Sequence, residues 1–217
     1  MNKENISKSV IRRLPRYYRF LTELEEQDID KISSGKLAAI MRSTASQVRQ
    51  DLNCFGGFGH QGYGYSVPAL RDEIAKILGL NKRYKAILVG AGHIGTAIAA
   101  HLRFDMMGFQ LVGIFDNNKE ILGAHINRVE IMDSENIGQF CRDNGVQAAF
   151  LCIPRSAAKQ TVKTLYDAGV TRFWNFTHYY IQGDYPEAVV ENVHLSDMLM
   201  TLCYRINEVE NSYDENE

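Results

Sequence analysis

The stretch LVGAGHIGTAI, from Leu88 to Ile98, carries glycines in the spacing G-x-G-x-x-G. Residues 84–89 predict a short buried strand and residues 96–102 predict the start of a helix. At a strand-to-helix turn, the first glycine permits the tight bend and the second lets a pyrophosphate approach the backbone, while the third lets the helix pack closely. The stretch therefore predicts a nucleotide-binding turn, although glycines gather in many tight turns.

A second feature extends this prediction. The predicted strand at residues 109–115 is followed by Asp116, where an acid can accept hydrogen bonds from an adenosine ribose. No arginine stands beside Asp116, which favours NAD(H) over NADP(H) because the acid would repel a 2′-phosphate. The alternative is an aspartate that only caps a turn at the strand end. The predicted cofactor-binding residues are Gly90, Ala91, Gly92, His93, Ile94, Gly95, Asp116, Asn117, Pro154 and Arg155.

The rest of the second half alternates strands and helices. Residues 148–153 and 173–176 predict strands on either side of a helix at 157–168, which indicates an α/β fold with a parallel sheet covered on both faces. Pro154 and Arg155 follow a strand, where ligands of such folds bind, but either could simply shape the turn. A packing helix is expected from Leu195, with a frayed acidic tail at 211–217.

An enzyme of this class needs a substrate lobe and an acid/base residue beside the cofactor. Only about 40 residues follow the last predicted strand, and they predict one helix. The sequence therefore argues against a dehydrogenase, and no catalytic residue is predicted. A small NAD-dependent oxidoreductase stays the alternative.

Composition sets the broad class. Of 217 residues, 45% are hydrophobic and 23% are charged, as in an ordinary globular protein. With no bilayer-length apolar run and no signal-like start, the chain is expected in the cytoplasm, away from membranes. The four cysteines form no C-x-x-C pair, so no metal site is predicted and reduced, mostly buried thiols are expected.

Charge divides the chain into two parts. Residues 1–85 carry 15 Lys and Arg against 9 Asp and Glu, a balance of +6, whereas residues 86–217 carry 9 against 17, a balance of −8. Opposite signs suggest two modules with different partners. The first module could approach a polyanion.

The first module predicts three helices and a hairpin. A helix over residues 9–26 is expected to bend or break at Pro15, a second runs from Ser33 through Met41, and a third begins near Ser43. In the third helix one face is apolar, and the other exposes side chains that can bond base edges. Residues 55–65 alternate glycine and aromatic residues, which is typical of a wing whose backbone approaches DNA. A polar helix face that is only solvated is the alternative.

In this order, residues 6–27, 33–40, 46–65, 89–98, 115–118, 153–160 and 175–181 resemble the Rex family of redox-sensing transcriptional repressors. The resemblance covers nearly the whole chain, and its winged-helix part is the more diagnostic. It implies a homodimer that binds palindromic operators in double-stranded DNA and releases them when NADH binds, with NAD+ and NADH as effectors. It also implies a winged-helix domain at 1–83, a Rossmann NAD(H)-binding domain at 84–194, and a domain-swapped dimerisation helix with an acidic tail at 195–217.

The predicted DNA-binding residues combine the polar helix face with the wing. They are Ser46, Gln47, Arg49, Gln50, Asn53, Gly59, His60, Gln61, Gly62 and Tyr63. His60 and Gln61 stand where many relatives have basic residues, which weakens phosphate attraction or shifts the operator preference.

The resemblance also implies a cofactor-sensitive network between the domains, formed here by Arg19, His101 and His194. His101 stands where the family commonly has Tyr, and His194 replaces an Asp. Losing an anionic partner removes a charge-assisted pair with Arg19. The two histidines are either a new pH-sensitive or cofactor-sensitive pair or ordinary polar substitutions. The chain could therefore be a paralogue with an altered or lost NADH response, and a partner protein whose basic segment contacts protein or RNA is a further alternative.

Overall fold

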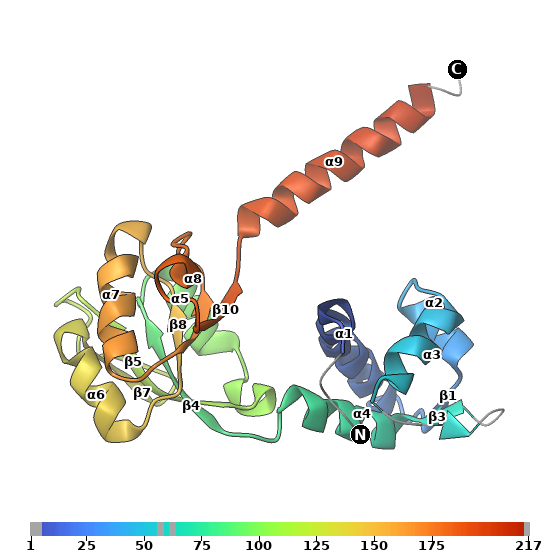
Figure 1. Ribbon diagram of the computed structural model, residues 1–217, viewed down its shortest axis with the longest axis horizontal. Coiled ribbons are helices and arrows are strands. Elements are labelled where there is room, and N and C mark those ends of the chain that lie inside the picture. Colours follow the sequence, from blue (N-terminus) through green and yellow to red (C-terminus); the bar gives the residue numbers. More distant parts are fainter. Residues whose placement is uncertain (1–5, 56–58, 61–63, 215–217) are drawn as a thin grey trace. The chain divides into compact units, whose positions relative to one another are not determined.

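The computed structural model describes residues 6–55, 59–60 and 64–214, and the chain divides into two compact units, residues 1–82 and 83–217 (Figure 1). The first unit contains seven elements within its described residues. They are α1 (Lys8–Glu25), β1 (Lys31–Ile32), α2 (Ser34–Ile40), α3 (Ala45–Asn53), β2 (Gly59–His60), β3 (Gly64–Ser66) and α4 (Val67–Leu78).

Side-chain caps fix where the helices begin. The hydroxyl of Ser33 accepts the backbone N–H of Lys36 at 3.1 Å, and the hydroxyl of Thr44 accepts that of Gln47 at the same distance. These caps satisfy N–H groups that the helices leave unpaired, so α2 and α3 start close to their predicted positions. Of the bend or break predicted at Pro15, the break is wrong, because α1 runs through Pro15 as one helix. Packing of the apolar face of α1 outweighs the loss of one helical hydrogen bond.

A small three-stranded sheet completes the winged helix. Strand β3 pairs antiparallel with both β1 and β2, and the register places Gly59 opposite Tyr65 and His60 opposite Gly64. Gly64 has a φ of +75°, and a Cβ there would lie 2.7 Å from the carbonyl oxygen of Ile32. The hairpin expected between residues 55 and 65 is therefore confirmed, while Gln61, Gly62 and Tyr63 lie outside the described residues.

An ionic cluster holds α3 against α1. The buried carboxylate of Asp51 on α3 accepts hydrogen bonds from Nε and Nη2 of Arg13 at 2.6 and 2.7 Å, and from the hydroxyl of Tyr17 at 3.0 Å. Gln47 Nε2 adds a fourth bond at 2.8 Å. Burial raises the pKa of Asp51, but the bonds from Arg13, Gln47 and Tyr17 outweigh it and hold the pKa below its ordinary value.

The second unit begins with β4 (Tyr84–Val89) and is built around a seven-stranded sheet. The strand order is β10-β9-β8-β4-β5-β7-β6, and all neighbours are parallel except β6, which pairs antiparallel with β7. The remaining elements are α5 (His93–His101), η1 (Phe104–Met107), β5 (Phe109–Asp116), β6 (His125–Ile126), β7 (Val129–Asp133), η2 (Ser134–Asn136), α6 (Ile137–Asn144), β8 (Ala148–Leu151), α7 (Arg155–Asp167), β9 (Arg172–Asn175), α8 (Ile181–Asp184), β10 (Val189–Asn192) and α9 (Leu195–Asp214). Omitting β6, this is the doubly wound Rossmann order.

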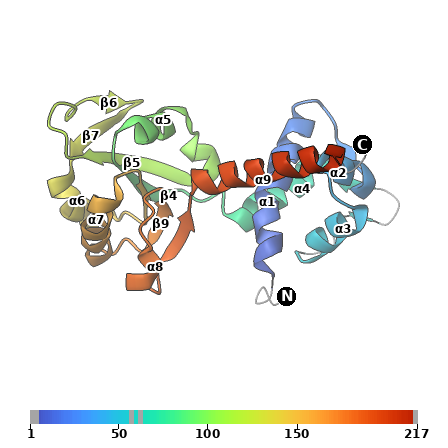
Figure 2. The same cartoon turned by 90° about the horizontal axis from the view of Figure 1, so that it is seen from above.

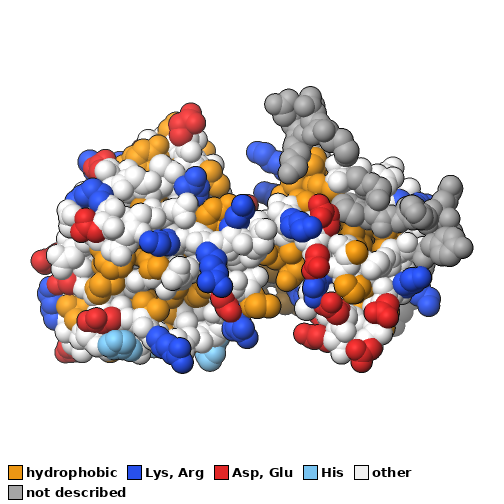
Figure 3. All heavy atoms as spheres, turned by 90° about the horizontal axis from the view of Figure 1, so that it is seen from below, with side chains coloured by type: hydrophobic (Ala, Val, Ile, Leu, Met, Phe, Trp, Pro, Cys, Tyr) orange, Lys and Arg blue, Asp and Glu red, His pale blue; other side chains and the backbone are white. Residues whose placement is uncertain are grey.

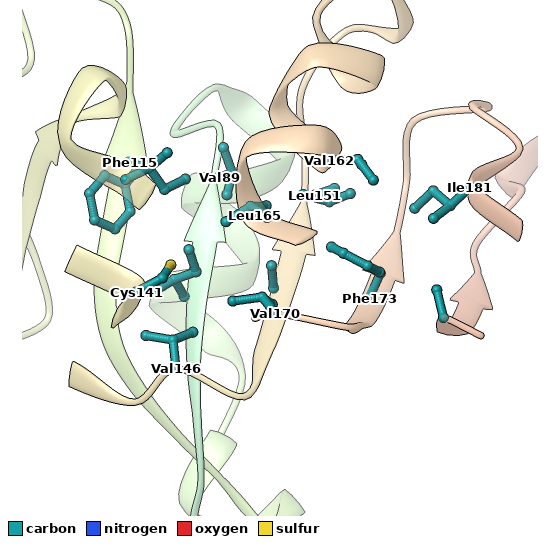
Figure 4. Close-up of a cluster of buried hydrophobic side chains, with 14 residues drawn as sticks. Val89, Phe115, Cys141, Val146, Leu151, Val162, Leu165, Val170, Phe173 and Ile181 are labelled. Atoms are coloured by element: carbon teal, nitrogen blue, oxygen red, sulfur yellow. The ribbon is translucent and has the colours of Figure 1, made fainter. Parts of the chain in front are cut away.

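Both faces of the sheet are apolar. Along β4, Ile87 and Val89 face one cluster while Ala86 and Leu88 face another, as the two-residue period of a strand requires. Helices α6 and α7 cover the first face and α5 covers the other (Figure 2). Figure 4 shows Val162 and Leu165 of α7 in the same buried cluster as Cys141 of α6, with Val162 next to Leu151 of β8.

Two further expectations need correction. Residues 211–214, of which Asp214 alone is acidic, belong to α9 rather than to a frayed tail, and residues 215–217 lie outside the described part. The cysteines are not mostly buried, since Cys54 and Cys203 are exposed and Cys141 alone is fully buried. All four thiols are free, and burial raises the pKa of Cys141 and of the half-buried Cys152 to about 12.

We expect Asp51→Ala to lower the free energy of unfolding by about 2–4 kcal/mol, because Arg13 and Tyr17 lose their acceptor; the side chain of Arg13 is 34% exposed and keeps some hydration. Urea unfolding at pH 7 measures this. The stabilisation is complete above about pH 4 and is lost as the pH falls through the lowered pKa of Asp51. Asp72→Ala is the control, because Asp72 pairs with Arg71 at the surface, and an equal loss there contradicts the expectation.

Candidate nucleotide and nucleic-acid sites

The glycine turn joins β4 to α5 at the carboxyl edge of the sheet. Gly90 has a φ of +96°, and a Cβ on it would lie 2.5 Å from the carbonyl oxygen of Cys152. A Cβ on Gly95 would lie 1.8 Å from the carbonyl oxygen of Gly90. Gly92 differs, because its φ is −71° and nothing lies within 4 Å of a Cβ placed there. The chain's own packing therefore requires Gly90 and Gly95, whereas at Gly92 it leaves open space.

Two helix starts lie at neighbouring strand ends. Gly92 caps α5 and Pro154 caps α7, and neither end has a side-chain cap. Because β4 and β8 are adjacent parallel strands, both helices begin at one edge of the sheet, on opposite faces. Unpaired N–H groups at a helix start attract anions. The exposed side chains of His93, Ile94 and Arg155 lie in these first turns.

Asp116 ties the glycine turn to β5. Its Oδ2 accepts the N–H of Ala91 at 2.6 Å, and its Oδ1 accepts the N–H of Asn118 at 2.8 Å. This is the turn-capping role weighed as an alternative to ribose binding. The two roles are compatible, because a carboxylate has about four acceptor positions and two are used here. Asn117 beside it is exposed.

Acidic side chains also lie next to Asp116. Asp133 on β7 lies opposite Asp116 in the sheet register. Lys119 forms a salt bridge with Asp133, and its Nζ also lies 3.7 Å from Oε1 of Glu135. The hydrogen bond to Asp133 raises the pKa of Lys119. The backbone N–H of Glu135 and then Lys119 lower the pKa of Asp133. Lys119 is thus already occupied by carboxylates, and this edge keeps a net negative charge.

The predicted reading helix presents the expected two faces. Val48 and Leu52 of α3 are buried in the first unit's core. The outward face consists of Ser46, Arg49, Gln50 and Asn53, all exposed. Arg49 Nη1 donates to Ser34 Oγ at 3.2 Å, whereas the Gln47 amide is used by Asp51. Gln47 therefore supports the helix in this structure, through an i,i+4 pair that the prediction did not consider.

The three predicted switch residues have separate surroundings. Arg19 lies 4.0 Å from Glu23 and stacks over the ring of Phe20 at 5.3 Å. His101 is the exposed last residue of α5. His194 does not pair with His101 in this chain but with His178, whose Nδ1 lies 3.2 Å from its own. Sequence reasoning missed His178, because only the fold brings it to His194.

The described part of the chain shows no helix long and apolar enough to cross a membrane. Within the same residues, no three His, Cys, Asp or Glu side chains come close enough to hold a metal ion. A winged helix beside a Rossmann unit with an open glycine turn defines a class of DNA-binding proteins that respond to a nucleotide.

Comparisons with known proteins identify the family. Family models described as "Putative DNA-binding protein N-terminus" and "CoA binding domain" match residues 5–53 and 81–179. The redox-sensing transcriptional repressor Rex of Caldanaerobacter subterraneus subsp. tengcongensis is 51% identical over 97% of this chain and 94% of its own. Rex of Clostridium perfringens is 47% identical over 94% of this chain and 96% of its own. The chain belongs to the Rex family of redox-sensing transcriptional repressors.

Solved structures agree with this assignment. RSP in complex with beta-NAD+ and operator DNA is 47% identical with a TM-score of 0.88, covering 97% of this chain and 96% of that one. RSP in complex with beta-NADH is 44% identical with the same TM-score of 0.88, covering 98% of this chain and 99% of that one. The fold prediction is confirmed, and so is the expectation of a repressor rather than an enzyme.

We expect Gly95→Ala to lower the midpoint of thermal unfolding by about 3 °C or more, because its methyl group collides with the Gly90 carbonyl. Gly92→Ala is the matched control and is expected to shift the midpoint by about 1 °C at most, since its methyl group enters open space. Differential scanning calorimetry measures both variants. Equal losses would show that Gly92 is needed for packing.

Proposed function

We propose that this chain is a homodimeric transcriptional repressor that binds operator DNA through α3 and the β2–β3 hairpin and senses NADH against NAD+ at the glycine turn. The observation that carries the proposal is that one chain contains two exposed candidate binding surfaces. One is the exposed polar face of α3, and the other is the open space at Gly92 where α5 begins. A cytoplasmic location follows from a DNA partner.

The cofactor site is proposed at the edge where α5 and α7 begin. The pyrophosphate would lie against the N–H groups after Gly92, and Asp116 would accept from the adenosine ribose with its free acceptor positions. The carboxylates that occupy Lys119 disfavour a 2′-phosphate there. This supports NAD(H) over NADP(H). RSP, whose complexes contain beta-NAD+ and beta-NADH, supports the same choice.

The cofactor acts here as a signal. NAD+ and NADH share adenosine and pyrophosphate, so contacts at the glycine turn add the same affinity to both. Discrimination must come at the nicotinamide, whose charge and ring shape change on reduction. A ligand shifts a conformational balance only by its difference in affinity for the two states. NADH would therefore release operator DNA by favouring a dimer whose two α3 helices no longer match successive major grooves.

The homodimer is proposed from α9. An apolar stripe runs along it at helical spacing, formed by Leu195, Met198, Leu199, Leu202 and Ile206. These side chains are exposed in the single chain, from 50% at Ile206 to 74% at Met198. Figure 3 shows other hydrophobic side chains at the surface, between charged ones, on the face that it displays. A helix with such a stripe needs a covering partner. A second copy of this chain is the partner that the Rex relationship supports.

Arg49→Ala is expected to weaken operator binding by about tenfold or more, because one groove-facing guanidinium is lost, and to leave NADH affinity unchanged. Fluorescence anisotropy with labelled operator measures the DNA affinity, and an NADH titration measures the cofactor affinity. Lys163→Ala on α7 is the control, since it removes one exposed cation from the other unit. Parallel loss of DNA and NADH binding would indicate misfolding rather than a lost contact.

Operator DNA is expected to weaken NADH binding, because two ligands that favour different states must oppose each other equally. An NADH titration of the dimer with saturating operator, compared with one without DNA, measures the effect. Equal NADH affinities in the two titrations would overturn the proposed switch. A duplex of scrambled sequence serves as the control for nonspecific charge.

Leu202→Glu is expected to convert the dimer to monomer, because it places a charge within the apolar stripe of α9. Sedimentation velocity measures the mass. Thr201→Glu adds the same charge to α9 outside the stripe, so it is expected to leave the dimer intact. A dimer that survives Leu202→Glu would place the interface elsewhere.

A further inference from the structure

Two histidines meet at the root of α9. His194 directly precedes the helix, and His178 lies in the loop after β9. Their Nδ1 atoms are 3.2 Å apart, and their rings lie nearly parallel, with centroids 5.0 Å apart and an angle of 16° between the planes. His194 is also tied to the helix, because its carbonyl oxygen accepts the N–H of Asp197 at 3.1 Å.

The loop that carries His178 is held firmly. His178 has a φ of +33°, in the left-handed region that histidine adopts more readily than most residues. The buried Asn175 fixes this turn, because its Oδ1 accepts the N–H of Thr177 at 3.0 Å and its Nδ2 donates to the carbonyl of Tyr179 at 3.0 Å. Asn175 Nδ2 also donates to Asn192 Oδ1 at 2.8 Å, at the end of β10. The His178 ring is thereby positioned against the strand that leads into α9.

The contact requires a particular protonation state. A hydrogen bond between two Nδ1 atoms exists only when one ring carries a proton there and the other offers its lone pair. When both rings are charged, both nitrogens are donors and the bond cannot form. Two positive charges would then also face the N-terminus of α9, where the helix dipole is itself positive.

Carboxylates lie on the elements next to the pair. Asp197 lies in the first turn of α9, and Glu191 lies on β10. Asp184 of α8 is already engaged by the Tyr179 hydroxyl and by Lys159 at 3.2 Å. A nearby carboxylate does not supply the lone pair that a doubly charged pair lacks.

We propose that the His178–His194 contact is a proton-sensitive latch that holds the first turn of α9 while at least one ring is neutral and opens when both rings are protonated. Between about pH 8 and pH 5, where histidines gain their second ring proton, the root of the helix changes from fixed to free. The effect on a dimer built through α9 rests on the function proposed above. The latch itself rests only on the contact between the two histidines.

Nuclear magnetic resonance of the full chain tests the contact directly. At about pH 8 the imidazole ¹⁵N shifts should show one ring of the pair protonated at Nδ1 and the other at Nε2 only. Amide hydrogen exchange then tests the latch, after correction for the intrinsic pH dependence of exchange. Among residues 195–199, the hydrogen-bonded amides, beginning with Asp197, should lose about tenfold in protection at pH 5.5. Tenfold is the factor for one pH unit of linked proton uptake.

Two variants isolate the pair. His178→Asn keeps a side chain that tolerates positive φ, and His194→Gln keeps hydrogen-bonding groups, but neither replacement takes up a proton in this range. Protection of residues 195–199 should be independent of pH in both. His125→Gln removes an exposed histidine on β6 and should behave as the wild type. Equal protection of the wild type at both pH values, or the same fall in the two variants, would overturn the latch.

Sedimentation velocity at pH 8 and pH 5.5 separates the latch from the proposed dimer. A latch that controls assembly is supported if the wild-type dimer dissociates at pH 5.5 but not at pH 8. In each variant the fraction of monomer should then be the same at the two pH values. A wild type that is monomeric at pH 8 overturns the proposed dimer, and the exchange result then decides the latch alone. A wild-type dimer that is unchanged by pH while protection of residues 195–199 also stays unchanged overturns the latch.

Discussion

The close approach of α5 to β4 is the constraint on which the second unit depends. No side chain fits at position 95, because a Cβ on Gly95 would lie 1.8 Å from the carbonyl oxygen of Gly90. This contact sets where α5 begins, and the Asp116 carboxylate then binds the N–H of Ala91 and ties the turn to β5. Open space at Gly92 is left at the helix start. The strand-to-helix packing and the candidate pyrophosphate site are thus consequences of one turn.

The first unit depends on a comparable contact between helices. Asp51 of α3 binds Arg13 and Tyr17 of α1 and Gln47 of its own helix, while Arg49 and Gln50 stay exposed on the other face. A buried carboxylate that satisfies several donors specifies one orientation of the helix. Reading DNA would require such a fixed helix, because base contacts depend on position to within a hydrogen-bond length. The outward position of these side chains thus follows from contacts on the buried face of α3.

Most of the elements were predictable because their signals are local. Caps such as Ser33 and Thr44 lie within four residues of the groups they bind, and the strand at 84–89 has the predicted bounds. Pro15 misled the prediction, because the packing of α1 against the rest of the unit overrides a local preference. Gln47 was predicted to bind DNA, and its amide bonds Asp51 one helical turn away, so its contact with DNA stays a prediction.

By itself, the sequence determined that this is a Rossmann unit joined to a winged helix, because glycine spacing, helix caps and apolar periodicity act over a few residues. Tertiary structure alone decided which charged and polar groups from different elements meet. Asp133 reaches Lys119 through strand pairing, and Asp51 reaches Arg13 across two helices. His178 and His194 are 16 residues apart, and they meet because β9 and β10 run side by side. Such contacts depend on how elements pack, which no local pattern of residues encodes.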